Sequence, residues 1–143
     1  MAESAFHNER SFRPAILIPV YNHEASVGPT LDAVLRYGCP VLMVDDGSGE
    51  ACREVLIALS NKYSSQVRLL HLAKNCGKGA AVKAGFIALM TDGYSHALQV
   101  DADGQHDITD FPLFLETGRS NPECIVTGYP KFHSDAVSET SPA

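Results

Sequence analysis

Short apolar runs alternate with longer, helix-like segments along most of this chain, and this alternation limits the folds available to it. The runs are continuously apolar, which is typical of strands that are buried on both faces. Five strands are predicted, over residues 15–20, 40–44, 67–72, 96–100 and 124–127. Helices are predicted between them, over about residues 24–36, 52–63 and 80–90, followed by a short helix capped by Thr109. We therefore expect an α/β fold with a mostly parallel sheet and helices on both of its faces.

The composition fits one globular domain. Of the 143 residues, 45% are apolar and 20% are charged, so the chain can bury an ordinary core. We expect a flexible leader at residues 1–13, an α/β domain at 14–129 and a disordered tail at 130–143. The leader lacks the apolar core of a secretory signal peptide, and no apolar run is long enough to form a transmembrane segment.

The charge balance and the cysteines restrict the partners and the compartment. The formal net charge is −6 and no run of Lys or Arg occurs, which argues against nucleic acid or an anionic membrane as a partner. An anionic ligand would then need local positive charge, backbone amides or a metal ion. The widely spaced cysteines form no C-x-x-C pair, so we expect reduced thiols in the cytoplasm rather than a zinc or redox motif.

Polar side chains follow three of the predicted strands, at the point where each strand ends. These groups are Asn22-His23-Glu24, Asp45-Asp46 and Asp101-Ala102-Asp103. Asp and Asn are also common in turns, and for a single pair that explanation usually suffices. Because the carboxyl ends of parallel strands share one edge of a sheet, we expect the three groups to converge. Three such groups in register favour a binding site over three unrelated turns.

The third group contains the candidate metal ligands. Asp101, Asp103 and Gln105 alternate along the chain, so their side-chain oxygens project to the same side if the segment is extended. Carboxylate and carbonyl oxygens suit Mg²⁺ or Mn²⁺, and a site with few protein oxygens leaves positions for water and a diphosphate. We predict Asp103 as a direct ligand, with Asp101 and Gln105 as supporting ligands or water holders.

Other known motifs match these positions less well or leave two readings open. A calcium EF-hand loop is excluded because His106 stands at its sixth position and Pro112 at its twelfth, where that loop needs Gly and Glu. Gly77-Lys78-Gly79 lacks the spacing of a phosphate-binding P-loop, so a phosphate contact and a plain glycine turn both remain open. Ser48 is predicted as a turn or cap residue because the G-x-S-x-G motif is absent. His106, beside the metal-ligand candidates, is predicted to brace the turn or to take part in catalysis.

Taken together, four ordered motifs resemble the family 2 glycosyltransferases. The similarity is greatest to the dolichol- or polyprenyl-phosphate mannosyl- and glucosyltransferases, and it spans Ala15 to about Gly128. The motifs are Ile18-Pro19-Val20-Tyr21-Asn22-His23-Glu24, Val44-Asp45-Asp46-Gly47-Ser48, Asn75-Cys76-Gly77-Lys78-Gly79 and Val100-Asp101-Ala102-Asp103-Gly104-Gln105-His106. The resemblance implies a Rossmann-like GT-A fold for nucleotide-diphospho-sugars, Mg²⁺ or Mn²⁺ as cofactor, and inverting sugar transfer from a nucleotide donor.

The resemblance also implies roles for single residues. Pro19 and Tyr21 would line the nucleobase pocket, Asp46 would accept a hydrogen bond from the base, and Asp45 would support the loop. Lys78 would lie near the donor phosphates. The full donor-binding set is Pro19, Tyr21, Asn22, Glu24, Asp45, Asp46, Lys78, Asp101, Ala102 and Asp103. The implied metal ligands are Asp103 and Gln105, with Asp101 on the ribose or sugar side of the metal.

Two departures from the family pattern shape the functional expectation. His23 stands where acidic or other polar residues are often found. Family members continue past the fifth strand into a segment that carries the general base and the acceptor site, so this chain resembles a C-terminally truncated, donor-binding part. The expected acceptor is a polyprenyl phosphate or a glycan. The missing base matters less for a lipid phosphate, because a phosphate monoester is largely ionised near neutrality, with a second pKa of about 6.

Three functional hypotheses follow. The first is a metal-dependent glycosyltransferase in the cytoplasm, or peripheral at the cytoplasmic face of a membrane. The second is a non-catalytic or incomplete nucleotide-binding module. The third, ranked last, is a response-regulator-like domain. Response regulators carry their acidic residues on the first and third strands and need a lysine near the fifth. Here the later acidic pair follows the fourth strand, and no lysine lies near the fifth strand before Lys131.

Overall fold

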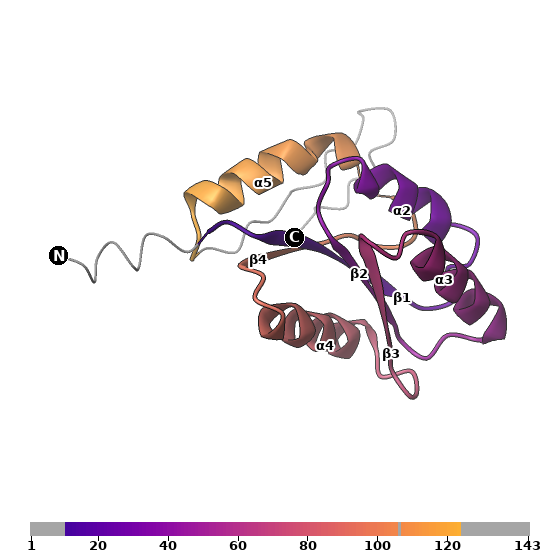
Figure 1. Ribbon diagram of the computed structural model, residues 1–143. Helices are drawn as coiled ribbons and strands as arrows, with labels where there is room; N and C mark the ends of the chain where they lie inside the picture. The colour runs from indigo at the N-terminus through magenta and orange to yellow at the C-terminus, as the bar shows by residue number, and fades with distance from the viewer. Residues whose placement is uncertain (1–10, 106, 124–143) are drawn as a thin grey trace, which may run out of the picture.

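The computed structural model describes residues 11–105 and 107–123 (Figure 1). Its centre is a four-stranded sheet in the order β3-β2-β1-β4, in which every pair of neighbours is parallel. The strands are β1 (Pro14–Val20), β2 (Val41–Asp45), β3 (Val67–His71) and β4 (His96–Gln99). Each agrees with the corresponding predicted strand to within one residue at either end. The predicted fifth strand at 124–127, the tail at 130–143 and most of the leader lie outside the described residues.

Helices connect the strands, and their first residues differ from the predicted ones by up to three positions. They are α2 (Val27–Leu35), α3 (Glu50–Lys62), α4 (Lys78–Thr91) and α5 (Phe111–Ser120), with a 3₁₀ turn η1 (Ile108–Asp110) before α5. The first helix begins at Val27 and not near Glu24, because a turn comes first in which the amides of Ser26 and Val27 both donate to the carbonyl of His23. The expected cap at Thr109 is also wrong: the side chain of Asp107 accepts from the amide of Thr109 and caps η1.

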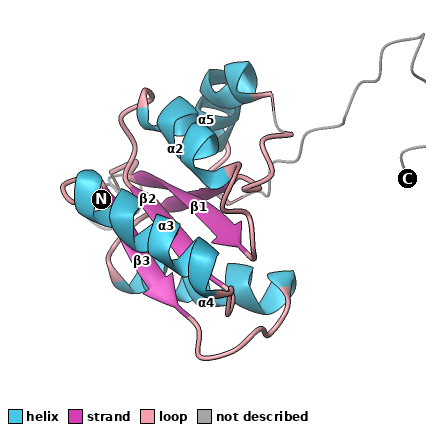
Figure 2. Ribbon diagram, turned by 90° about the vertical axis from the view of Figure 1, so that its right-hand side faces the viewer, coloured by secondary structure: helices cyan, strands magenta, loops and turns pink. Residues whose placement is uncertain are grey.

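The helices form one layer on each face of the sheet (Figure 2). Helix α4 covers one face, where Leu17, Val44 and Leu89 belong to one buried cluster. Helices α2, α3 and α5 cover the other face, where residues such as Ile16 and Ile18 form a larger cluster. Neighbouring residues of β1 therefore point to opposite layers, as a pleated strand requires. The expected α/β architecture with helices on both faces is confirmed.

The order of the strands defines where a ligand site can form. The chain proceeds from β1 to β2 to β3 in one direction and then returns, so that β4 lies on the opposite side of β1. In open α/β sheets, ligands bind beyond the carboxyl ends of the strands at the point where the order reverses. Here that point lies between the segments that follow β1 and β4, which are residues 21–26 and 100–105.

Candidate functional site

Asp45, at the end of β2, is buried and holds its own loop in place. Only 1% of the residue is exposed. Its Oδ1 accepts from the amide of Ser48 at 2.9 Å, and its Oδ2 lies 2.7 Å from Nδ1 of His71 at the end of β3. Burial alone would raise the pKa of Asp45, but the hydrogen bonds of Ser48 and the hydrogen bond and charge of His71 together outweigh it and leave the pKa lower than usual. The carboxylate form is therefore favoured.

Asp46 binds the segment that leads into α4. Its Oδ1 accepts from the amide of Cys76 at 2.8 Å, and its Oδ2 accepts from the amide of Gly77 at 3.1 Å. The side-chain amide of Asn75 adds a hydrogen bond to Oδ2 at 3.3 Å. The structure thus gives Asp46, which is 3% exposed, three donors from this segment. Two amides just before the first residue of α4 are therefore bound to this carboxylate.

Gly47 allows these two segments to come together. Its φ is +69°, a left-handed conformation that glycine adopts without strain. A Cβ atom at this position would lie 2.3 Å from the backbone nitrogen of Asn75, far closer than packing allows. The contact between Asp46 and the start of α4 therefore depends on the absence of a side chain at Gly47.

The segment after β1 is tied to the segment after β2. The amide of Asn22 donates to Oγ of Ser48 at 3.0 Å, and the amide of Gly49 donates to Oδ1 of Asn22 at 2.8 Å. Asn22 has a φ of 57°, which its short polar side chain tolerates. Beside it, 46% of Tyr21 is exposed.

The other candidates from this segment differ in exposure. Glu24 lies exposed in the turn before α2. Pro19 is buried within β1, opposite Val44 of β2. The surface that the segment after β1 offers to a ligand is thus made by its exposed residues rather than by Pro19.

The segment after β4 is anchored at Ala102 and exposed beyond it. The carbonyl of Ala102 accepts from Oγ of Ser26 at 2.6 Å, which fixes the segment to the start of α2. Oδ1 of Asp103 accepts from the amide of Gln105 at 3.0 Å across Gly104, whose φ is +77°. The segment therefore turns at Gly104 and is not extended, so the alternation argument for a shared side does not hold here. Both Asp103 and Gln105 are exposed to solvent.

An ion pair joins the segment after β4 to α4. Nζ of Lys78, the first residue of α4, lies 2.6 Å from Oδ1 of Asp101. Since Asp46 binds Gly77, the residue just before Lys78, a continuous set of contacts links the end of β2, the start of α4 and the end of β4. Asp46 and Asp101, which were predicted to converge at one edge of the sheet, are thus linked through residues 77 and 78.

The chemistry of the donor set fits a hard divalent cation that also binds a diphosphate. Asp101, Asp103 and Gln105 offer two carboxylates and an amide oxygen, and Mg²⁺ usually binds through one or two carboxylates with waters and phosphates completing its shell. Within residues 11–105 and 107–123, no group of three or more His, Cys, Asp or Glu residues is arranged to hold a metal ion by itself. His106, the remaining candidate of this region, lies outside the described residues.

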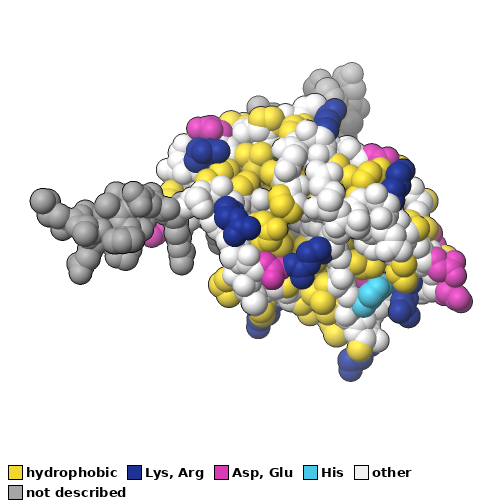
Figure 3. Space-filling view, in the orientation of Figure 1, with side chains coloured by type: hydrophobic (Ala, Val, Ile, Leu, Met, Phe, Trp, Pro, Cys, Tyr) yellow, Lys and Arg dark blue, Asp and Glu magenta, His cyan; other side chains and the backbone are white. Residues whose placement is uncertain are grey.

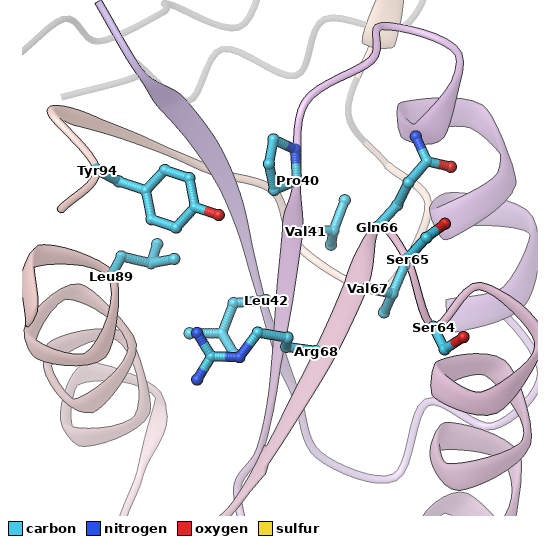
Figure 4. A pocket seen from close by; sticks show the side chains of 10 residues that line it. All are labelled: Pro40, Val41, Leu42, Ser64, Ser65, Gln66, Val67, Arg68, Leu89 and Tyr94. Carbon is cyan, nitrogen blue, oxygen red and sulfur yellow. The ribbon is translucent and has the colours of Figure 1, made fainter. Parts of the chain in front are cut away.

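A cavity lies apart from this site. The cavity, of about 180 Å³, is lined at the amino ends of β2 and β3 by residues such as Pro40, Val41, Gln66 and Val67 (Figure 4). It therefore lies at the opposite edge of the sheet.

On the face shown in Figure 3, Lys and Arg side chains are scattered among apolar and acidic ones. In the part of the chain that the structure describes, no helix is long and apolar enough to span a membrane.

Several residues that build the site carried no signal in the sequence. Ser26, His71 and Asn75 lie within ordinary turn or strand segments, and their partners are 26 to 76 residues away. Gly47 could have been found, because a glycine directly after two carboxylates indicates a special backbone conformation or a close approach.

Sequence comparison gives a family match and several relatives. The model of the family described as Glycosyl transferase family 2 matches residues 15–143. The polyprenol monophosphomannose synthase of Mycolicibacterium smegmatis is 33% identical over 107 residues, which cover 73% of this chain and 40% of that protein. A dolichyl-phosphate beta-glucosyltransferase of Trichomonas vaginalis is 34% identical over 127 residues, which cover 78% of this chain and 36% of that protein. The chain thus spans about two fifths of the length of these relatives.

Solved structures show the same fold. The mannosyltransferase PcManGT from Pyrobaculum calidifontis, solved in complex with GDP-Man and Mn²⁺, superposes with a TM-score of 0.54 at 21% identity over 64% of this chain and 27% of its own. TarS (residues 1–349) of S. aureus has the same TM-score and identity over 73% of this chain and 32% of its own. These neighbours confirm the expected GT-A architecture. The family match over residues 15–143 shows that this chain belongs to glycosyl transferase family 2.

Proposed function

We propose that this chain forms the donor-binding part of a metal-dependent, inverting glycosyltransferase. It would bind a nucleotide-diphospho-sugar, with Mg²⁺ or Mn²⁺, and transfer the sugar to a polyprenyl phosphate or a glycan. The observation that carries the proposal is the set of contacts joining Asp46, the start of α4 and Asp101 at the edge where the strand order reverses. Membership of glycosyl transferase family 2 supports the reaction class. The proposed location is cytoplasmic, at the membrane surface when the acceptor is a lipid phosphate.

The nucleobase would bind beside the segments after β1 and β2. Tyr21 is 46% exposed, and its ring would stack against the base. A carboxylate has about four sites for accepting hydrogen bonds, and Asp46 uses three of them within the protein, which leaves room for one donor from the base. Asp45 would keep this loop in position through Ser48, and Asn22 would hold it against the segment after β1.

The diphosphate would bind between Lys78 and the segment after β4. The ammonium of Lys78 would contact the donor phosphates, while Asp101, Asp103 and Gln105 would hold the cation. When bound, that cation would neutralise the negative charge that develops on the departing nucleoside diphosphate. The Asx turn formed by Asp103 and Gln105 keeps the Asp103 side chain at the surface, facing incoming ligand rather than the core. No catalytic base is assigned among these residues.

Calorimetry with GDP-, UDP- and dTDP-sugars, with and without Mn²⁺, tests donor binding. We expect binding that depends on Mn²⁺ and that weakens at least about tenfold in Asp103→Ala, because even the loss of a group that only supports a metal ligand typically costs about 10–100-fold. Asp110→Ala is the matched control, because Asp110 is an exposed carboxylate near η1 whose side chain makes no capping hydrogen bond. A folded protein that binds none of these donors would refute the proposal. Transfer of labelled sugar to polyprenyl phosphate separates an enzyme from a non-catalytic module.

A further inference from the structure

Lys78 and Asp101 are paired with each other, although the proposed function gives each of them a different ligand. Nζ of Lys78 lies 2.6 Å from Oδ1 of Asp101, and the side-chain amide of Gln99 donates to the same oxygen at 3.3 Å. The proposed function, on which this inference rests, directs Lys78 to the donor phosphates and Asp101 to the cation. In this structure the two side chains are therefore bound to each other, and not to these ligands.

This pairing opposes the binding of either ligand alone. An ammonium within hydrogen-bond distance of a carboxylate repels a second cation that approaches it, and it cancels much of the attraction that the carboxylate would exert. In the same way, Asp101 weakens the attraction of Lys78 for phosphate. A nucleoside diphosphate together with its cation satisfies both side chains at once.

The ion pair can exchange partners at low cost. The side chains of Lys78 and Asp101 are 59% and 28% exposed, and ion pairs with this much exposure contribute little to stability. The flexible stem of a lysine also allows its ammonium to move without movement of the backbone. The neighbouring backbone is fixed on both sides, by Gly77 bound to Asp46 and by Ala102 bound to Ser26. The exchange is thus confined to side chains.

We propose that Lys78 holds Asp101 until a nucleoside diphosphate draws its ammonium away, so that the protein binds the divalent cation efficiently only together with the donor. Lys78 is then a positioning residue that couples the two ligands. The coupling is reciprocal: the factor by which the nucleotide raises the affinity for the cation equals the factor by which the cation raises the affinity for the nucleotide.

The test measures Mn²⁺ binding in the absence of nucleotide, by calorimetry and by the electron paramagnetic resonance signal of free Mn²⁺. We expect Lys78→Met to bind Mn²⁺ about fivefold more tightly than the wild type, which corresponds to the loss of an exposed ion pair. Lys78→Arg keeps the charge and should bind Mn²⁺ as the wild type does. Lys83→Met is the matched control, since Lys83 is exposed on the same helix and makes no ion pair with the described residues.

A second measurement adds GDP or UDP, whichever the wild type binds. The factor by which the nucleotide raises Mn²⁺ affinity should fall in Lys78→Met and stay unchanged in Lys83→Met. As an independent variant, Asp101→Asn should bind the nucleotide more tightly than the wild type when Mn²⁺ is absent, because Lys78 is released. Far-UV circular dichroism confirms that each variant is folded.

The outcomes separate this inference from the proposed function. If the wild type binds a nucleotide but Lys78→Met gains no Mn²⁺ affinity, the inference is overturned and the proposed function stands. If neither protein binds Mn²⁺ alone, the inference is overturned as well. If no nucleotide binds to any folded variant with or without Mn²⁺, the proposed function fails and the coupling fails with it.

Discussion

The segments after β2 and β4 both carry two aspartates that follow an apolar run, yet the structure builds them differently. Asp45 and Asp46 are 1% and 3% exposed, and both oxygens of each carboxylate have partners. Asp45 binds Ser48 of its own loop and His71 at the end of β3, and Asp46 binds the segment before α4. Asp103 is exposed, and its hydrogen bond is to the amide of its near neighbour Gln105. One pattern of residues therefore serves as scaffold in the first segment and faces solvent in the second.

The position of each strand in the sheet explains the difference. Strand β2 lies between β1 and β3, so the segment that follows it has neighbours on both sides to supply donors. Strand β4 has β1 on one side and is the outer strand of the four described. The segment after β4 therefore finds fewer internal partners, and its carboxylates are left for the solvent, for Lys78 or for a ligand.

The largest expected effect comes from adding a methyl group to each turn glycine. Gly47→Ala should lower the free energy of unfolding by about 3 kcal/mol, because the new Cβ would meet the backbone of Asn75 and the residue would be strained at φ +69°. Gly104→Ala should cost only about 1 kcal/mol, since among the described residues its Cβ would meet only Oγ1 of Thr30, at 3.7 Å. Urea unfolding measures both values. Equal losses would contradict the contrast between the two segments.

A smaller effect is expected when the carboxylates themselves are removed. Asp46→Ala leaves the amides of Cys76 and Gly77 without their acceptor and should lower the free energy of unfolding by about 2 kcal/mol. Asp103→Ala should change it by less than about 0.5 kcal/mol, as is usual for an exposed side chain. The same urea titrations give both numbers. A stability loss in Asp103→Ala that matches that of Asp46→Ala would show that the second segment is scaffold as well.

The smallest expected effect is a pH dependence of stability in the first segment. Folding lowers the pKa of Asp45, so its ionised form stabilises the protein above the unfolded-state pKa of about 4, and this contribution is lost as the pH falls through the lower folded-state pKa. The difference in unfolding free energy between wild type and Asp45→Asn should therefore shrink from pH 6 towards pH 2. Urea unfolding at a series of pH values measures it. A difference that stays constant across this range would refute the role assigned to this carboxylate.

The two central strands, β1 and β2, were predictable because they are apolar over almost their whole length, whereas β3 and β4 also contain polar residues. A strand such as Ile16–Val20, buried on both faces, leaves a continuous apolar run that no other element of this length produces as readily. The start of α2 was not predictable in the same way. The turn at His23–Ser26 is fixed by backbone hydrogen bonds to His23, and these leave no periodic pattern in the sequence.

The candidate site was predictable in its place but not in its contacts. The rule that parallel strands end at one edge placed Asp46 and Asp101 in the same region. It gave no information on which donors would bind Asp46, because Asn75–Gly77 lie about 30 residues further along the chain and are brought near by the packing of α4. The turn at Gly104 was not predictable either. Side chains alternate from face to face only within a strand, and β4 ends at Gln99, before this segment begins.

The hydrogen bonds from the amides of Cys76 and Gly77 to Asp46 affect how strongly the amino end of α4 attracts an anion. The amino end of a helix such as α4 carries roughly half a positive charge from its aligned peptide dipoles, and many proteins use it to attract phosphate. Here a carboxylate of the protein itself already lies against it. A diphosphate that enters this corner meets a macrodipole that this carboxylate partly offsets, so its charge would be balanced by Lys78 and by a counterion that arrives with it.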